Sequence, residues 1–214
     1  MTSSETTAGT ALEPMSGAEW DAAYRRGTWV WDEPPPAELT ELLLGYLPPP
    51  ATVVDLGCGI GTTARTVAAL GYSVHGCDAS AVAIELARSR STAGDGCRFS
   101  VLDVVQQTDQ IPSADLAIDR GVLHTRPSPA SRTAFVAAVA TVCAPGAWWL
   151  HIGAAASDAA GSTSFVRGPS ALTEIDFRTL TEPYFTLHEL RDIPYGTNPG
   201  ETDFDARIAM LRRR

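Results

Sequence analysis

The amino-acid sequence contains no lysine. Its 16 basic residues are all arginine, and 25 acidic residues give the 214-residue chain a formal net charge of −9. This acidic balance argues against a nucleic-acid-binding protein, because phosphates require a broad basic surface. No apolar run is long enough to span a membrane, and the first residues lack the charged and apolar regions of a secretory signal. We therefore expect a cytoplasmic protein that binds neither nucleic acid nor membrane.

Cysteine is also scarce and is not paired. Cys58, Cys77, Cys97 and Cys143 form no C-x-x-C motif, and three of them fall in or beside apparent core strands and helices. Reduced structural thiols are the expected state of such residues in a cytosolic protein. The sequence also has no cluster of acids and amides typical of a metal site, so no metal is expected.

A buried-strand pattern followed by a glycine loop dominates what the sequence does contain. Residues 52–56 are mostly β-branched or apolar, and Gly57, Gly59 and Gly61 follow at alternate positions before a helical segment at 62–70. Glycines without side chains let the backbone turn sharply and lie against a ligand, whose polar groups then meet the free amides of the helix N-terminus. On the loop alone, a ligand site and a tight structural turn are equally good interpretations.

Two acids that follow the next two strands favour the ligand site. Asp78 ends a strand predicted at 73–77 and has the spacing of an acid that binds ribose hydroxyls, while Asp103 follows a strand at 98–102, where an adenine amine can be held. The glycine spacing is G-x-G-x-G, whereas a dinucleotide fingerprint places its third glycine one residue later. This difference weakens an NAD or FAD interpretation.

Five segments together resemble a known family, the class I S-adenosylmethionine-dependent methyltransferases. The matching segments are VVDLGCGIG at 53–61, GCDAS at 76–80, LD at 102–103, DLAIDRGVLH at 115–124 and CAPGAWWLHI at 143–152. The resemblance covers roughly residues 15–214. A looser likeness to the thiopurine S-methyltransferase-like and tellurite-resistance-like enzymes rests on WDAAYRRGTWVWDEPPP at 20–36, on DRGVLH and on RGP at 167–169.

The resemblance implies an α/β, Rossmann-like sheet of seven strands, mostly parallel with an antiparallel last strand, and with helices on both faces. Residues 1–14 are expected to be a disordered tail, and 15–214 the methyltransferase domain, with an N-terminal helical lid at about 15–47. The remaining elements are expected at 16–27, 37–46, 114–119, 131–142, 147–153, 172–180, 185–193 and 204–211. The three arginines at 212–214 are expected to form a solvated tail.

The resemblance also implies the cofactor and its contacts. S-adenosyl-L-methionine is expected as methyl donor and S-adenosyl-L-homocysteine as product. The expected cofactor-binding residues are Trp29, Trp31, Asp55, Gly57, Cys58, Gly59, Asp78, Ala79, Asp103, Val104, Asp119 and Arg120. Each tryptophan has the alternative of packing on the sheet edge, and Arg120 that of pairing with a neighbouring acid.

Asp119 and His124 are the candidate catalytic residues, because Asp119 ends the fourth strand where open α/β sheets place their chemistry. His124 is either a general base or a hydrogen-bonded structural residue, and His151 is expected to be a satisfied core histidine. The expected substrate-binding residues are Tyr24, Trp31, His124, Phe165, Arg167 and Tyr195.

The acceptor is expected to be a small molecule. The sequence lacks the Asn or Asp followed by two prolines and an aromatic that base-amine methyltransferases carry after the fourth strand. A thiol is favoured, because it ionises near neutrality without a strong base. Alternatives are a hydroxyl or amine of a small aromatic metabolite, or a protein that binds the cofactor without transferring methyl. A monomer or homodimer is expected.

Overall fold

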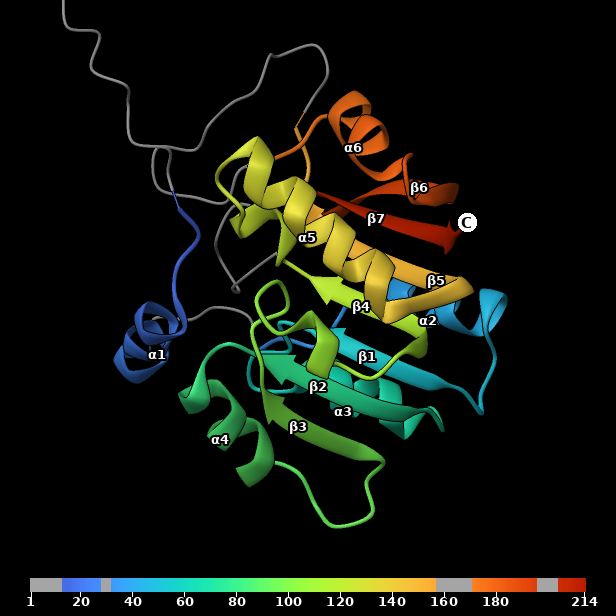
Figure 1. Ribbon diagram of the computed structural model, residues 1–214. Coiled ribbons are helices and arrows are strands. Elements are labelled where there is room, and N and C mark those ends of the chain that lie inside the picture. The colour runs from blue at the N-terminus through green and yellow to red at the C-terminus, as the bar shows by residue number, and fades with distance from the viewer. Residues whose placement is uncertain (1–12, 28–31, 157–170, 196–203) are drawn as a thin grey trace, which may run out of the picture.

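The structure is a computed structural model that describes residues 13–27, 32–156, 171–195 and 204–214, without the side chains of Tyr195 and Phe204. A single seven-stranded sheet crosses the molecule in the order β3-β2-β1-β4-β5-β7-β6 (Figure 1). The strands are β1 (Thr52–Leu56), β2 (Ser73–Asp78), β3 (Cys97–Val101), β4 (Ala114–Arg120), β5 (Cys143–Ala154), β6 (Phe185–Tyr195) and β7 (Phe204–Arg213). Strand β7 runs antiparallel to both of its neighbours, β5 and β6, and the other strand pairs are parallel, which confirms the predicted sheet.

Helices cover both faces of this sheet. They are α1 (Gly17–Arg26), α2 (Ala37–Tyr46), α3 (Thr62–Ala69), α4 (Ala81–Ser89), α5 (Pro129–Val142) and α6 (Glu174–Thr181), with short 3-10 turns η1 (Thr108–Gln110) and η2 (Leu123–Thr125). Helices α5 and α6 pack on one face, and α2, α3 and α4 on the other (Figure 1). Among these residues, no helix is long and apolar enough to cross a membrane.

The two core layers follow from strand alternation. Successive side chains of a strand point to opposite faces, so Val53 packs with α2 and α3 while Val54 packs with α5. Both valines are fully or almost fully buried. Helix α2 contributes Leu39 and Leu43, neither of which is exposed, to the layer under β1. Helix α2 is therefore part of the scaffold of the domain.

The local signals in the N-terminal segment form as predicted. Ser16 and Glu19 make a reciprocal capping box at the start of α1, and Gly27 ends the helix in the left-handed conformation that glycine favours. Helix α2 has the predicted bounds.

Two predictions for the C-terminal half are wrong. The strand expected at 147–153 begins earlier, at Cys143. The chain remains extended through Pro145 and Gly146 and pairs with β4 across a bulge. The arginines at 212–214 are no solvated tail, because β7 continues to Arg213. There the side chain of Arg213 donates to the carbonyls of Ala140 and Tyr184, which fixes it on the α5 side of the sheet.

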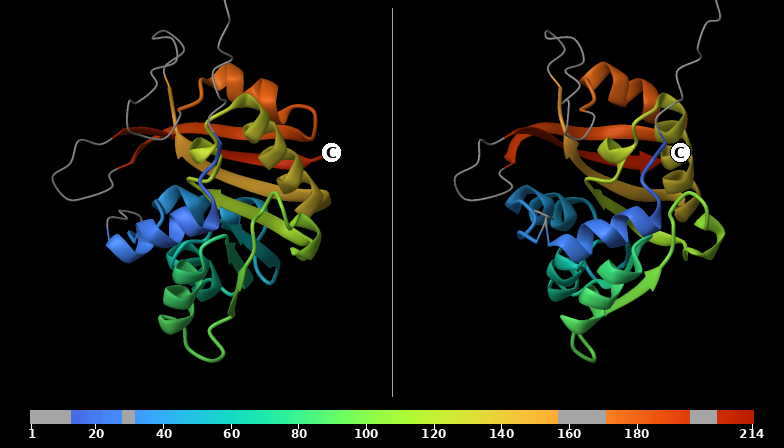
Figure 2. Two further views of the ribbon diagram at one scale, coloured as in Figure 1. Left: turned by 60° about the vertical axis from the view of Figure 1, so that its left-hand side comes forward. Right: turned by 90° about the vertical axis from the view of Figure 1, so that its left-hand side faces the viewer.

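The carboxyl ends of β1 to β5 meet at one edge of the sheet. Strand order reverses there, since β2 and β3 lie on one side of β1 while β4 and β5 lie on the other. Open α/β sheets bind ligands outside such a reversal. Helix α1 lies beside these strand ends, at the arrowheads of β1 to β4 (Figures 1 and 2).

Candidate active site

The glycine loop between β1 and α3 adopts a backbone that other residues rarely take. Gly57, Gly59 and Gly61 all have positive φ, at 67°, 53° and 78°. A Cβ on Gly57 would stand 2.2 Å from Val122, and one on Gly59 would stand 2.8 Å from the hydroxyl of Tyr24. Both the dihedral angles and the close neighbours therefore require glycine at these positions.

Asp78 connects this loop to the next helix. Its Oδ2 accepts a hydrogen bond from the Gly59 N–H at 2.9 Å, and its Oδ1 accepts one from the Ser80 N–H at 2.8 Å. The side chain is buried, and desolvation raises the pKa of this carboxyl although both amides act in the opposite direction. Asp78 therefore holds the loop at the carboxyl end of β2, where the ribose contact is predicted.

Asp103 organises the turn after β3 with one oxygen. Its Oδ1 accepts hydrogen bonds from the N–H groups of Val105 and Gln106, at 2.8 and 2.9 Å. The Asp103 N–H donates to the side chain of Gln107 at 3.0 Å. The Asp103 carboxylate is thereby fixed at the carboxyl end of β3, next to the predicted ligand residue Val104, which is itself buried.

Asp55 is buried beneath the loop with part of its carboxylate unsatisfied. It is 2% exposed, and its Oδ2 has no hydrogen-bond partner among the described residues. Desolvation raises the pKa of Asp55 to about 7, against the attraction of Arg120. A buried carboxylate without a partner is costly unless a ligand or water satisfies it, so Asp55 is suited to a cationic or hydrogen-bond-donating group.

Helix α1 packs against the start of α4, beside the glycine loop. Asp21 Oδ1 accepts hydrogen bonds from the Ser80 hydroxyl at 2.6 Å and from the Val82 N–H at 3.1 Å, so it caps α4 from a distant part of the chain. A Cβ on Gly17 would stand 2.5 Å from the carbonyl of Ala79, a predicted cofactor residue. Tyr24, a predicted substrate residue, is buried against Ile60 and Ala83.

The segment that follows the undescribed residues 28–31 is fixed by three elements. Asp32 pairs with Arg90 at the end of α4 at 2.8 Å, and it accepts a hydrogen bond from Thr62 at the start of α3. Although desolvation opposes the shift, these hydrogen bonds lower the pKa of Asp32. Arg120 at the end of β4 donates to the carbonyl of Glu33 at 2.8 Å. Residues 32 and 33 therefore span the strand ends from α4 to β4.

Asp119 and His151 form a buried pair at the ends of β4 and β5. Asp119 is completely buried, and its Oδ1 lies 2.6 Å from His151 Nδ1, while its Oδ2 accepts a 3.3 Å hydrogen bond from the Leu123 N–H. The His151 ring stacks on Phe177 of α6 at 5.0 Å. The prediction that His151 is a satisfied core histidine is confirmed, and Asp119 lies below the surface of the crevice.

His124 belongs to the 3-10 turn η2, which follows β4. Its Nδ1 accepts a hydrogen bond from the Ala154 N–H at 3.0 Å, so the neutral ring carries its proton on Nε2. Desolvation, with a contribution from His151, lowers the pKa of His124 to about 4. His124 is therefore a neutral hydrogen-bond donor near pH 7, with its basic nitrogen engaged by the backbone.

The remaining predicted site residues are Cys58, which the structure describes, and five that it describes only in part or not at all. Cys58 lies in the loop, buried, and desolvation raises the pKa of its thiol well above the usual value. Four predicted site residues lie outside the described residues, and of a fifth only the backbone is described: Trp29, Trp31, Phe165, Arg167 and, with its backbone in β6, Tyr195. Their assignment remains a prediction.

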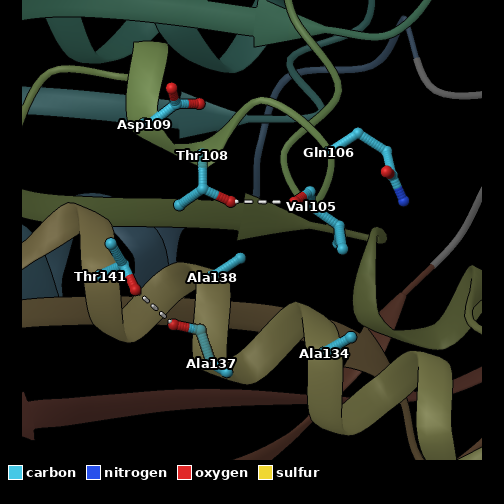
Figure 3. Close-up of a pocket in the computed structure, with 8 residues that line it drawn as sticks. All are labelled: Val105, Gln106, Thr108, Asp109, Ala134, Ala137, Ala138 and Thr141. Carbon is cyan, nitrogen blue, oxygen red and sulfur yellow. Dashed lines mark hydrogen bonds between the residues drawn. The ribbon is translucent and has the colours of Figure 1, made fainter.

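A shallow groove of about 400 Å³ lies elsewhere, between residues 105–109 and helix α5 (Figure 3). Alanine and threonine side chains of α5 form one wall, and the Thr108 hydroxyl on the other wall is turned toward its own backbone (Figure 3). None of the predicted site residues that the structure describes lines this groove. The candidate site is therefore the carboxyl ends of the strands, which carry Asp55, Asp78, Asp103 and Asp119.

Comparison with known families identifies the central part of the chain. Residues 54–149, from β1 into β5, match a family model described as a methyltransferase domain. This segment is a methyltransferase domain. It contains the glycine loop, Asp78, Asp103, Asp119 and His124. No curated protein matches the chain significantly.

Solved structures extend the likeness to the whole methyltransferase fold. One was reported for the conversion of a disulfide bond into a thioacetal group during echinomycin biosynthesis, with 25% identity, 93% of each chain covered and a TM-score of 0.73. The Burkholderia thailandensis 1,6-didemethyltoxoflavin-N1-methyltransferase, bound to 1,6-didemethyltoxoflavin and S-adenosylhomocysteine, shares 19% identity over 98% of this chain and 97% of its own, with a TM-score of 0.74. A Methanosarcina mazei SAM-dependent methyltransferase shares 22% identity over 80% and 96%, with a TM-score of 0.67.

The residues at the strand ends fit S-adenosylmethionine, the cofactor that the sequence resemblance implies. Bare glycines line the loop, Asp55 offers a buried unsatisfied oxygen below it, and Asp78 and Asp103 stand at the next two strand ends. The chain has the fold of S-adenosylmethionine-dependent methyltransferases, and its residues 54–149 match a methyltransferase domain. The narrower likeness to thiopurine or tellurite-resistance enzymes remains a prediction.

Sequence reasoning missed the contacts of Asp21, the unsatisfied Nε of Arg126 and the pairing of His151 with Asp119. Asp21 caps a helix about 60 positions away, and no local pattern signals such a contact. His151 was placed in the core, but its pairing with Asp119 depends on the register of β4 and β5. Arg126, two residues after His124, carries a buried Nε atom that has no hydrogen-bond partner within the described ranges.

Proposed function

We propose that this enzyme transfers a methyl group from S-adenosylmethionine to the thiol of a small aromatic or secondary metabolite. The observation that carries the proposal is the state of the two candidate bases. His124 is neutral with its Nδ1 engaged by Ala154, and Asp119 is fully buried and bonded to His151. A site in which these side chains are unavailable as bases suits an acceptor that ionises by itself, and thiols do so with a pKa of about 8.5.

In this proposal the acids and glycines position the cofactor. Asp55 binds the ammonium group of the cofactor, Asp78 binds its ribose hydroxyls and Asp103 binds its adenine amine. Gly57 and Gly59 have no side chains, so the cofactor can lie against the backbone of the loop. When bound, S-adenosylmethionine supplies a methyl group made electrophilic by a sulfonium. Cys58, Ala79, Val104 and Arg120 line the same crevice, with Trp29 and Trp31 over it. The predicted disordered tail at 1–14 takes no part, and the lid consists of α1 and the segment up to residue 36.

The chain's residues contribute alignment and exclusion of water. Attack by a thiolate forms the new carbon–sulfur bond as the bond to the sulfonium breaks, and the leaving sulfur keeps the electron pair. The thiol has lost its proton to solvent beforehand, so no proton is abstracted by the protein. Holding the two reactants in line is the main source of the rate enhancement. Tyr24, His124, Phe165, Arg167 and Tyr195 are the proposed acceptor contacts, with the Nε2–H of His124 as a donor.

Sulfur chemistry has support from one structural neighbour. The protein reported for the conversion of a disulfide bond into a thioacetal group acts on sulfur, and it matches 93% of this chain at 25% identity. We propose the same acceptor element here, in line with the looser likeness to thiopurine S-methyltransferases. The experiment below separates a thiol acceptor from the hydroxyl and amine alternatives.

The experiment compares matched small aromatic acceptors that differ only in carrying a thiol, a hydroxyl or an amine. Production of S-adenosylhomocysteine is measured with each. Turnover with the thiol at a rate at least about tenfold above the other two is expected, since only the thiol ionises near neutrality. Turnover confined to the hydroxyl or the amine would contradict the proposal. An Asp78→Ala variant serves as the control for turnover that depends on this site.

A further inference from the structure

Arg126 is a partly buried cation that the methyl-transfer scheme above does not use. It directly follows η2, and its Nε atom is buried without a hydrogen-bond partner among the residues that the structure describes. An unsatisfied donor on a charged group is among the more costly features of a protein interior. Such a donor is explained when a ligand supplies the missing acceptor.

The protein holds Arg126 in place without satisfying this donor. The guanidinium carbon lies 5.4 Å from the ring centroid of Phe135, a fully buried residue of α5. The Arg126 carbonyl accepts a hydrogen bond from Arg132 Nε at 3.0 Å. Stacking on an aromatic face and a fixed backbone restrict the guanidinium to one region beside the strand ends.

The neighbouring charges show which part of the crevice this region serves. The carboxylates that act on Arg126 are those of Asp103, Asp119 and Asp78, in that order, and they oppose the burial that lowers the pKa of Arg126. Arg120 is the cation that acts on Asp55. Asp103, which follows β3, is therefore the carboxylate that acts most strongly on Arg126, while Arg120 acts on Asp55 of β1.

We propose that Arg126 binds the adenine ring of S-adenosylmethionine, with its Nε–H donating to a ring nitrogen while Asp103 accepts from the exocyclic amine. This inference rests on the proposed placement of the cofactor. Adenine offers a donor and acceptors on one planar edge, and a carboxylate beside a guanidinium presents the complementary pair. Arg126 acts as a cofactor-positioning residue, and the acceptor does not contact it.

The experiment measures the affinity of the full chain for two probes by calorimetry. S-adenosylhomocysteine contains both ends of the cofactor, whereas 5′-methylthioadenosine lacks the amino-acid end. Arg126→Met is expected to weaken both probes by the same factor, about 10- to 100-fold, because both carry adenine. Arg120→Met is expected to weaken S-adenosylhomocysteine alone. Arg98→Met changes an exposed arginine on β3 and is the matched control.

Thermal unfolding of the ligand-free variants separates binding from folding. The midpoint of Arg126→Met is expected to equal or exceed that of the wild type, because the substitution removes a buried charge. Arg126→Lys keeps the charge without the planar donor. This variant is expected to bind both probes more weakly than the wild type does, as Arg126→Met does. The proposal is overturned if Arg126→Met weakens S-adenosylhomocysteine but not methylthioadenosine, if neither affinity changes, or if the midpoint falls with the affinity. Wild-type protein that binds neither probe would instead reject the cofactor assignment itself.

Discussion

The carboxylate of Asp78, at the end of β2, accepts a hydrogen bond from the N–H of Gly59 across 2.9 Å. This bond ties the loop after β1 to the neighbouring strand, and it places the carboxylate predicted to bind ribose in contact with the glycine that admits the cofactor. Asp78 therefore has a structural role in the loop in addition to its role as a ligand.

Asp78→Ala should weaken S-adenosylmethionine binding by at least ~1 kcal/mol, because a charge-assisted hydrogen bond is lost and the loop loses an anchor. Calorimetry measures the change. Asp115→Ala is the matched control, since Asp115 bonds Thr52 at the opposite edge of the sheet. Unchanged affinity in Asp78→Ala would remove this residue from the site.

The pKa of Asp55, raised to about 7, predicts a pH dependence of stability. The folded state favours the protonated form, so this group stabilises the protein below the unfolded pKa near 4, and the contribution is lost as pH rises through 7. Relative to Asp55→Asn, the wild type should lose on the order of 4 kcal/mol of unfolding free energy between pH 4 and 8. Denaturant titrations of both proteins measure the difference, in which other groups cancel. A difference that stays constant with pH would show that Asp55 is not buried as described.

The same group predicts a pH dependence of cofactor binding. A cationic ammonium favours the ionised carboxylate, so affinity for S-adenosylmethionine should rise as pH increases through about 7. In Asp55→Asn this rise should be absent. If wild type and variant show the same pH dependence, Asp55 does not contact the ammonium.

Gly57→Ala tests the backbone of the loop. Its φ of 67° is strained for alanine, and the new methyl would stand 2.2 Å from Val122. We expect a loss of at least about 1–2 kcal/mol in unfolding free energy from the dihedral angle alone. Adding Val122→Ala should recover only the part that is due to the clash. Full recovery in the double variant would mean that the dihedral angle carries no cost.

The Asp119–His151 pair predicts strong coupling. His151→Leu leaves a fully buried carboxylate without its main partner, which should cost about 3–5 kcal/mol of stability. The double variant Asp119→Leu with His151→Leu should be less destabilised than the sum of the single changes. A double-mutant cycle from chemical denaturation measures the coupling. Additive effects would contradict the pairing.

The sequence predicted the elements that depend on local signals. The glycine loop, the capping box of Ser16 and Glu19 and the antiparallel last strand all follow from spacing, turn residues or the family resemblance. Contacts between distant segments were not predictable in this way. Asp21 as a cap of α4 and the inclusion of Arg212 and Arg213 in a strand depend on how elements pack in three dimensions.

For the site, the sequence predicted which residues converge but not their chemical state. His124 was an open choice between a base and a structural residue, and the Ala154 N–H together with burial decides its protonation. Asp119 was expected to face the ligands, whereas register with His151 places its carboxylate in a buried pair. Protonation and pairing follow from desolvation and neighbours, which a linear pattern does not contain.

The most direct test is the pH dependence of single-turnover methyl transfer to aromatic thiols of different acidity, in the wild type and in His124→Gln. We predict that the rate rises with pH along the ionisation of each thiol and that the apparent pKa moves with the thiol. His124→Gln should lower the rate by less than about tenfold without moving that pKa, since general-base catalysis is worth about 10²–10⁴-fold. A pKa that is the same for every thiol and that disappears in His124→Gln would show that the protein supplies the base, and it would contradict the account.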